Sequence, residues 1–308
     1  MFSVIFPGQG SQIVGMGKEF YDRYDVVKKL FQEADDTLGI NLSKIILNGP
    51  KEQLDLTANT QPAIFLISYS IFQVIKNQFN INLNDTKYFA GHSLGEYSAL
   101  SCANYLDFNQ TIKILRIRGN AMQNSVHQGE GGMLAVLGST IKDIEKILVD
   151  NEKNFKAFIA NDNTEGQLVI SGKINDLEKL SDILKNKKIK NIKLPVSAPF
   201  HCNLMIKAKE IMSHELQKIR FQKSNNILIS NVTANEIKNI DELKSLLIDQ
   251  IERRVRWRES VIKMINKGVN QFIEIGPGKV LTGLIKRIDK NVKTISINAI
   301  SDIESLKI

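Results

Sequence analysis

Residues 91–95 read Gly-His-Ser-Leu-Gly, the residue types and spacing of a nucleophile elbow, which is a sharp turn between a strand and a helix. Glycine is needed on both sides of the serine because larger side chains would collide in so tight a turn. The hydroxyl of Ser93 would project from the turn, and free N–H groups at the start of the following helix would favour an oxyanion. The flanking residues, Tyr88 to Ala90 and Glu96 to Cys102, have the patterns of the required strand and helix. The motif predicts a serine nucleophile, with an ordinary tight turn as the alternative.

A serine nucleophile needs a base, and the chain has four histidines. His92 lies inside the elbow, where the geometry of the turn should point it away from the serine. His127 and His214 lie in hydrophilic stretches. His201 follows Ser-Ala-Pro-Phe at a junction between a loop and a helix, where sites are commonly built. His201 is therefore the candidate base, and a structural or solvated histidine is the alternative.

The two cysteines, Cys102 and Cys202, belong to no C-x-x-C pair and to no cluster of metal ligands. A zinc site or a disulfide framework is therefore not expected. Cys202 follows His201 directly, but adjacent residues on a helix do not face each other. We expect a small, partly buried thiol there and no thiol nucleophile.

The chain has 308 residues, of which 43% are hydrophobic and 24% charged, as is ordinary for a globular protein. The longest apolar stretch, Ala63 to Ile75, is interrupted by polar residues and is typical of a buried helix, so no membrane span is expected. Met1 to Phe6 has the pattern of a short strand without a basic segment before it, which argues against a signal peptide. We therefore expect a cytoplasmic location.

The formal net charge of +8 is compatible with nucleic acid, a membrane surface or an acidic protein as partner. The lysines are scattered, with small basic clusters at Lys185 to Lys190 and at Arg253 to Arg258. No nucleic-acid-binding motif with interleaved aromatic residues accompanies them. We expect neither nucleic acid nor a membrane as partner, and an acidic protein partner stays open.

Strands and helices alternate along most of the chain, which indicates an α/β fold. From residue 131 to residue 194 the predicted order is βαββαβ, the ferredoxin-like arrangement, with a turn at Asn161 to Gly166. Another strand is expected at Asn226 to Ser230. We expect a hydrolase-like large α/β catalytic domain with a parallel sheet core, built from residues 1–128 and 197–308. Residues 129–196 would form a small ferredoxin-like subdomain inserted into it.

Six segments, spread over the chain from Phe2 to about Ile288, occur together in the order and form of one enzyme family. They are Phe6-Pro7-Gly8-Gln9-Gly10-Ser11-Gln12, Gly91-His92-Ser93-Leu94-Gly95-Glu96, Arg118-Gly119-Asn120-Ala121-Met122-Gln123, Ala198-Pro199-Phe200-His201, Gln250 with Arg254-Val255-Arg256-Trp257, and Glu274-Ile275-Gly276-Pro277-Gly278. The chain resembles the malonyl-CoA:acyl carrier protein transacylase family, which is related to the acyltransferase domains of polyketide synthases.

The resemblance implies roles for the matching positions. Ser93 would be the acylated nucleophile, and His201 the general base and then the general acid. Gln250 would orient His201 through its carbonyl group, in the place of the carboxylate of a triad. Gln9 and Leu94 would donate backbone N–H groups to the oxyanion hole.

Arg118 would pair with the free carboxylate of the malonyl group, because its rigid fork matches a carboxylate in bidentate geometry. A solvated helix arginine is the alternative. Phe200 resembles the residue of malonyl-selecting members of the wider family, where a bulky ring leaves little room for an α-methyl branch; a core phenylalanine is the alternative. The loop from Asn161 to Gln167 departs from the family, since Glu165 stands where proline is common.

The resemblance implies transfer of the malonyl group from malonyl-CoA, a substrate, to the phosphopantetheine thiol of acyl carrier protein. This ping-pong reaction through a malonyl-serine would supply fatty acid synthesis without a metal or redox cofactor, and a monomer is expected. One alternative is a serine hydrolase or thioesterase of the G-x-S-x-G type, but that class places its histidine near the C-terminus, and no histidine follows His214. Another is a non-catalytic carrier-protein-binding module, which the full set of proposed catalytic residues disfavours.

Overall fold

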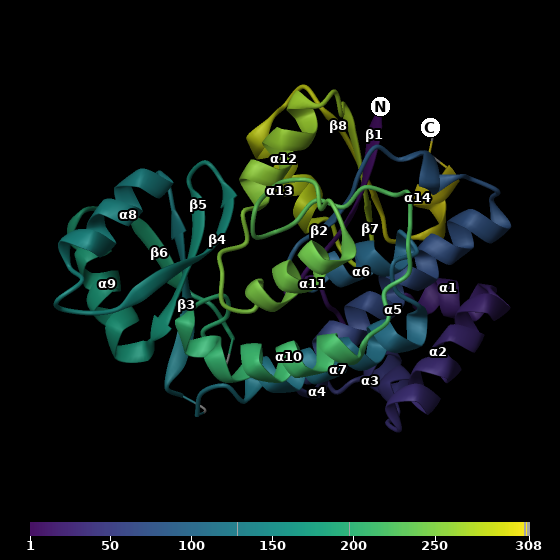
Figure 1. Ribbon diagram of the computed structural model, residues 1–308, viewed down its shortest axis with the longest axis horizontal. Coiled ribbons are helices and arrows are strands. Elements are labelled where there is room, and N and C mark those ends of the chain that lie inside the picture. The colour runs from purple at the N-terminus through teal and green to yellow at the C-terminus, as the bar shows by residue number, and fades with distance from the viewer. Residues whose placement is uncertain (128, 197, 305, 307–308) are drawn as a thin grey trace.

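The chain forms two separate four-stranded sheets, one parallel and one antiparallel (Figure 1). The computed structural model describes residues 1–127, 129–196, 198–304 and 306. The parallel sheet has the strand order β2-β1-β7-β8, and the antiparallel sheet has the order β4-β5-β3-β6. The fold is therefore mixed α/β, as predicted.

The parallel sheet is buried on both faces, as its apolar strands require. In β1, Val4 and Phe6 enter one hydrophobic core while Ile5 enters the other. Side chains that alternate in this way tie the sheet to helices on each side. The strands are β1 (Phe2–Phe6), β2 (Phe89–Gly91), β7 (Gln271–Ile275) and β8 (Lys293–Ile297).

Helices pack on both faces of the parallel sheet, with α5 buried along most of its length. The run from Ala63 to Ile75 lies in this helix, so the prediction of a buried core helix is confirmed. No helix within the described residues is long and apolar enough to cross a membrane. The helices of this part are α1 (Lys18–Arg23), α2 (Asp25–Leu38), α3 (Leu42–Asn48), α4 (Lys51–Leu54), α5 (Thr57–Gln78), α6 (Gly95–Cys102), α7 (Phe108–Gln123), α10 (Ile206–Lys218), α11 (Ile240–Asp249), α12 (Trp257–Asn266), α13 (Val280–Ile288) and α14 (Ile300–Glu304), with short 3-10 helices η1 (Leu83–Asp85) and η2 (Asn203–Met205).

The antiparallel sheet carries two amphipathic helices on one face, which lie at the far left of Figure 1. Leucines and isoleucines of α8 and α9 pack on apolar residues of β3 and β5 in a core of their own. The predicted order βαββαβ is confirmed. The elements are β3 (Gly131–Leu137), α8 (Ile141–Asp150), β4 (Ala157–Thr164), β5 (Gln167–Lys173), α9 (Ile174–Asn186) and β6 (Lys190–Lys193).

Two local predictions differ from the structure. The turn expected over Asn161 to Gly166 is wrong for its first four residues, which belong to β4 and pair with β5 through two register shifts. The segment Asn226 to Ser230 lies beside β2 but forms isolated bridges and no regular strand. In both segments a long-range partner decides the backbone conformation. The predicted domain boundaries fall at residues 128 and 197, which lie outside the described residues.

Candidate active site

The elbow connects β2, which ends at Gly91, to α6, which begins at Gly95. Ser93 at its tip has φ 54°, in the left-handed region that non-glycine residues seldom adopt. A Cβ atom on Gly91 would lie 2.0 Å from the backbone of Gly95, and one on Gly95 would lie 2.3 Å from the carbonyl oxygen of Phe6. Both flanking glycines are thus required by close backbone approach, as the motif predicts.

His201 lies directly against the serine. Its Nε2 is 2.8 Å from Ser93 Oγ, and its Nδ1 is 2.7 Å from the backbone carbonyl oxygen of Gln250. A carbonyl oxygen only accepts hydrogen bonds, so Nδ1 carries the proton and donates it. This leaves Nε2 as the acceptor for the hydroxyl proton of Ser93, which is the tautomer that a general base needs.

The imidazole of His201 is held in its neutral form. Burial, and after it the nearby positive charge of Arg118, lower the pKa of His201 to about 3. The side chain is 4% exposed. A neutral ring is the form that takes a proton from serine, so the environment keeps the base available.

The other three histidines are directed elsewhere. His92 Nε2 lies 2.9 Å from Asn163 Oδ1, and its ring packs against Trp257, so it points away from the serine hydroxyl as predicted. His127 is exposed, and His214 is an exposed partner of a neighbouring glutamate on α10. Of the four histidines, the structure brings His201 to the serine.

Arg118 projects from α7 into the site and is 1% exposed. Its Nη2 donates to Ser93 Oγ at 3.1 Å and to Gln250 Oε1 at 2.8 Å, and its Nη1 donates to Gln61 Oε1 at 2.7 Å. Burial lowers the pKa of its guanidinium. This side chain is not the solvated arginine of the alternative interpretation; Arg116 bonds elsewhere, to the carbonyl oxygen of Ala58.

Gln250 contributes both its backbone and its side chain. Its carbonyl oxygen holds His201, and its amide Nε2 donates to the carbonyl oxygen of Ser93 at 3.0 Å and to the carboxyl group of Glu96. The amide Oε1 accepts from Arg118. The residue therefore joins the base, the elbow and the buried arginine.

Two backbone N–H groups stand free next to the elbow. In the part of the chain that the structure describes, neither the N–H of Gln9 nor that of Leu94 has a hydrogen-bond acceptor. Leu94 precedes the first residue of α6, where the helix dipole favours negative charge. Gln9 lies in the loop after β1, which presses on the elbow, since a Cβ atom on Gly8 would lie 2.7 Å from the carbonyl oxygen of His92. Such groups are suited to bind an oxyanion.

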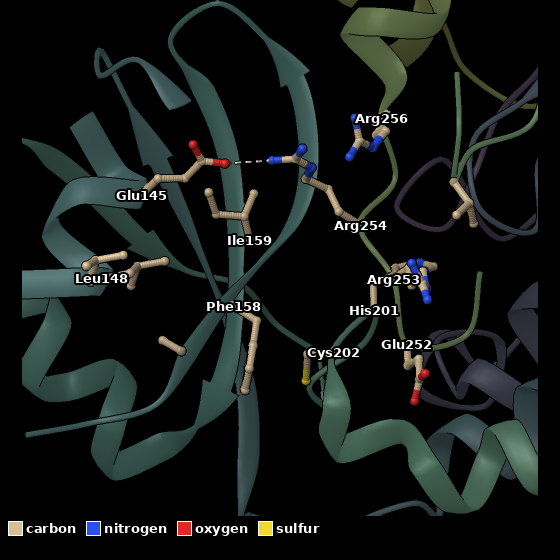
Figure 2. A pocket seen from close by; sticks show the side chains of 13 residues that line it. Glu145, Leu148, Phe158, Ile159, His201, Cys202, Glu252, Arg253, Arg254 and Arg256 are labelled. Carbon is tan, nitrogen blue, oxygen red and sulfur yellow. Dashed lines mark hydrogen bonds and ion pairs between the residues drawn. The ribbon is translucent and has the colours of Figure 1, made fainter. Parts of the chain in front are cut away.

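A cavity of about 490 Å³ opens beside His201, between the two sheets (Figure 2). On one side it is lined by apolar residues of α8 and β4, and on the other by the segment from Glu252 to Arg256. The ion pair between Arg254 and Glu145, 3.1 Å long, spans it. His201 therefore lines a cavity whose walls are partly apolar and partly basic.

Cys202 and Phe200 flank His201 without contributing a reactive group. Burial raises the pKa of the Cys202 thiol to about 12, and the thiol donates to the carbonyl oxygen of Pro199 at 3.0 Å. The thiol is more deeply buried than expected, with 1% of the residue exposed, and its raised pKa is consistent with the expectation of no thiol nucleophile. Phe200 is 7% exposed and packs in the main hydrophobic core, which fits the alternative of a core phenylalanine as well as a role next to the site.

Sequence reasoning missed Asn231, Glu96, Asn163 and Gln61, which all bond to site residues. Asn231 directly follows the apolar segment Asn226 to Ser230, which lies beside β2. A polar residue at the carboxyl end of a predicted strand could have indicated a place in the site. Glu96 and Asn163 lie in segments already compared with the family, which was their signal, and Gln61 carried none. Among the described residues, no group of three or more His, Cys, Asp or Glu side chains is placed to hold a metal ion.

A serine on a strand-to-helix elbow, bonded to a histidine that is itself held by an acceptor, is the arrangement of enzymes that pass acyl groups through a serine ester. Residues 3–302 match the family model of the acyl transferase domain. The fold, the site and this match together define an acyltransferase.

Curated relatives indicate which kind of acyltransferase the chain resembles. The malonyl CoA-acyl carrier protein transacylase of Bacillus subtilis (strain 168) is 42% identical over 307 residues, which cover 99% of this chain and 94% of the relative. The enzyme of the same name from Escherichia coli (strain K12) is 37% identical over 302 residues, covering 98% and 96%. The chain belongs to the malonyl CoA-acyl carrier protein transacylase family.

Solved structures agree. The acyl-carrier-protein-S-malonyltransferase from Bartonella henselae has a TM-score of 0.96 and 42% identity, with 99% of this chain and 97% of the other covered. A malonyl-transacylase in complex with its type II PKS acyl-carrier protein has a TM-score of 0.94 and 35% identity, covering 99% and 98%. The arrangement of one parallel and one separate antiparallel sheet is that of these enzymes.

Proposed function

We propose that this enzyme transfers a malonyl group from coenzyme A to the phosphopantetheine thiol of an acyl carrier protein, through an ester on Ser93. The observation that carries the proposal is the 2.8 Å contact between Ser93 Oγ and His201 Nε2, in a chain whose relatives are named for this reaction. The solved relative in complex with its carrier protein supports the choice of partner.

In the first half-reaction Ser93 Oγ attacks the thioester carbonyl carbon while its proton moves to His201 Nε2. The negative charge that develops on the carbonyl oxygen is stabilised by the N–H groups of Gln9 and Leu94. The carbon–sulfur bond then breaks, and the sulfur of coenzyme A leaves with the proton held by His201. Ser93 is left as the malonyl ester, and His201 is neutral again.

In the second half-reaction the thiol of the carrier protein's phosphopantetheine arm gives its proton to His201 and attacks the ester carbonyl. The bond to Ser93 Oγ breaks, and the proton returns to that oxygen. Atoms and charges balance with side chains and two thiols alone, so we propose no cofactor for the cycle.

Arg118 selects the acyl group in this proposal. One methylene separates the ester carbonyl of a malonyl-serine from its free carboxylate, and Arg118 Nη2 already lies 3.1 Å from Ser93 Oγ. The guanidinium fork would pair with this carboxylate. Phe200 is proposed to restrict branching at the α-carbon, which its bulk and its place before His201 support.

The cavity beside His201 is the proposed route of the pantetheine arm. Its apolar wall would contact the aliphatic part of the arm. Arg253, Arg254 and Arg256 line the opposite side and would attract the phosphates of coenzyme A and the acidic carrier protein (Figure 2).

The architecture supports a finer description, which we propose as well. The order β4-β5-β3-β6 in a βαββαβ unit is typical of a ferredoxin-like subdomain, residues 129–196. The parallel sheet with its elbow is typical of a hydrolase-like catalytic domain made from residues 1–128 and 197–308.

Intact-protein mass after brief mixing with malonyl-CoA tests the function. We expect a malonyl adduct on the wild type that disappears when phosphopantetheinylated carrier protein is added, and no adduct on Ser93→Ala. Ser98→Ala is the matched control, because this buried hydroxyl on α6 makes no hydrogen bond among the described residues. Its adduct should equal that of the wild type.

Other outcomes separate the rival functions. Release of free malonate without the carrier protein would indicate a serine hydrolase or thioesterase. No adduct and no malonate would indicate a non-catalytic carrier-protein-binding module. Either result would contradict the proposed transfer.

A further inference from the structure

Asn231 lies where the elbow needs support. The segment before it runs parallel to β2: Phe89 N–H donates to the carbonyl oxygen of Ile227 at 2.8 Å, and Ile229 N–H donates to that of Phe89 at 3.1 Å. The carboxyl ends of these two neighbouring segments therefore meet at one edge of the sheet. The elbow leaves β2 at this edge, and Asn231 faces it with 1% exposure.

The side-chain amide of Asn231 bonds to both arms of the turn. Its Nδ2 donates to the carbonyl oxygen of Gly91 at 2.7 Å, and its Oδ1 accepts from the backbone N–H of Ser93 at 2.7 Å. Both contacts are short and direct. They act on the peptide units on either side of His92, so they oppose any rotation that would let Ser93 leave its strained conformation at φ 54°.

The backbone of Asn231 ties the elbow to the support of the base. Its carbonyl oxygen accepts from the N–H of Arg256 at 2.9 Å, and its own N–H lies 3.4 Å from Glu96 Oε1. The amide Nε2 of Gln250 lies 3.4 Å from Asn231 Oδ1. Asn231 thus contacts the serine turn on one side and, on the other, the segment whose carbonyl at Gln250 holds His201.

We infer that Asn231 is a positioning residue for acyl transfer: its amide holds Ser93 in the left-handed turn that keeps Oγ in line with His201. The inference rests on the proposed function and adds a residue to it. A buried asparagine with a merely structural role would stabilise the fold equally, so the test must separate alignment of the nucleophile from stability.

Asn231→Asp makes that separation, because it keeps the shape of the side chain. One carboxyl oxygen still accepts from Ser93 N–H, but the other donates to the carbonyl oxygen of Gly91 only while the carboxyl group is protonated. The titratable or charged groups on the segments that bond to Asn231, or to its partner Ser93, are Glu96 on α6, Arg256 before α12, His92 in the elbow, Arg118 on α7 and His201 beside η2. Burial favours the protonated form of the introduced carboxyl group, and Arg118 opposes it. Burial also raises the pKa of Glu96 to about 8, so this neighbour is mostly neutral below that pH, in the variant and in the wild type alike.

The experiment measures the single-turnover rate of Ser93 malonylation between about pH 5.5 and about pH 8.5. Each rate is divided by the concentration of folded enzyme, and the variant's rate is then divided by the wild-type rate at the same pH. We expect this ratio to fall as the pH rises, with a loss of about tenfold to a hundredfold at the alkaline end. The malonyl-CoA concentration that gives half the maximal rate should stay near the wild-type value, because Asn231 touches the turn and not Arg118.

Asn226→Asp is the matched control, because Asn226 Nδ2 also donates to a backbone carbonyl, that of Ala103 at 3.1 Å, away from the elbow. Its ratio should not change with pH. If Asn231→Asp does not fold, Asn231→Ser replaces it, and we expect a loss of rate at every pH with unchanged half-saturation.

A ratio for Asn231→Asp that is independent of pH, or that Asn226→Asp reproduces, would overturn the inference. So would an Asn231→Ser enzyme that acylates at the wild-type rate. A wild type that forms no malonyl-serine would instead overturn the proposed function, so the two failures are distinguishable.

Discussion

At the scale of single residues, the hydroxyl of Ser93 is held between a base and a cation. It donates to His201 Nε2 at 2.8 Å and accepts from Arg118 Nη2 at 3.1 Å. In the proposed mechanism this cation would stabilise negative charge on the oxygen as the proton leaves. The same cation is proposed to turn to the substrate carboxylate after acylation, so one arginine would serve both activation and selection.

Replacing Arg118 by lysine keeps the charge but removes the bidentate fork. We expect the preference for malonyl-CoA over acetyl-CoA in the acylation rate to fall about tenfold to a hundredfold, the value of a charge-assisted hydrogen bond. Competition between the two thioesters, followed by intact mass, measures it. Arg116→Lys on the same helix is the control, and an unchanged preference in Arg118→Lys would contradict the proposed selection.

The acylation rate at acidic pH should depend on the protonation state of His201. Since burial lowers its pKa to about 3 from 6.5, the neutral base persists well below pH 6.5. We expect the acylation rate constant to show no half-loss near pH 6.5 between about pH 8 and about pH 5. Rapid mixing and quenching at each pH measures it, and a midpoint close to 6.5 would be incompatible with a buried neutral base.

The same shift affects stability, with a sign that follows from proton binding. Below pH 6.5 the unfolded chain binds a proton at His201 while the folded chain does not until about pH 3. The contribution of this residue to the free energy of unfolding therefore falls as the pH decreases from 6.5 toward 3.

At the scale of elements, the elbow depends on how closely β2 and α6 approach. The two flanking glycines leave no room for side chains, and the strained φ of Ser93 is held by contacts from other segments. The loop after β1 brings Gln9 to the same edge of the sheet. The site therefore lies where strands end, and the candidate base His201 lies in the loop before η2.

Gly91→Ala should remove both the adduct and a large part of the stability, because its Cβ atom would lie 2.0 Å from the backbone of Gly95. Gly283→Ala is the matched control: this glycine of α13 has open space around it, so alanine should raise the free energy of unfolding by about 0.4–1 kcal/mol. Urea unfolding and intact mass measure the two effects. If Gly91→Ala were as stable as the wild type, the backbone of the elbow could shift to make room for a Cβ atom. That result would contradict the steric requirement for glycine.

At the scale of the whole molecule, the two sheets are joined next to the active site. The end of β4 pairs with the segment before α12, where Val255 N–H donates to the carbonyl oxygen of Ala160 at 2.8 Å. Arg258 donates three hydrogen bonds of 2.9–3.1 Å to the buried carboxylate of Asp162. The elbow itself reaches the same strand through His92 and Asn163. The width of the cavity is therefore set by the contacts that hold the sheets together.

Asp162→Asn should lower the free energy of unfolding by about 2 kcal/mol, since a charge-assisted bond to a buried carboxylate is lost and Arg258 is partly exposed. Urea unfolding measures the difference. Asp182→Asn, which removes an exposed pair with Lys185, is the control and should change the stability by less than about 0.5 kcal/mol. Equal losses in both variants would show that the Asp162 pair does not fasten the sheets.

The elbow and the order of elements could be predicted because they depend on local physics. Glycine spacing around Ser93 reports a steric limit within five residues, and apolar periodicity reports which face of a strand or helix is buried. With only four histidines in the chain, His201 could be proposed as the base by its surroundings, and the geometry places it there. The resemblance to a family extended the assignment to Gln9, Leu94, Arg118 and Gln250.

Other features required the tertiary structure. Asn231 is 138 residues from Ser93, and Gln61 is 57 residues from Arg118, yet each bonds directly to its partner. The β4 extension over Asn161 to Thr164 likewise depends on partners in β5 and at Val255. The sequence alone determined the candidate nucleophile, the candidate base and the alternation of elements, because local sterics, the small number of histidines and periodicity specify them. Only the tertiary structure decided which buried amides hold them, because an amide's partners are set by how distant segments pack.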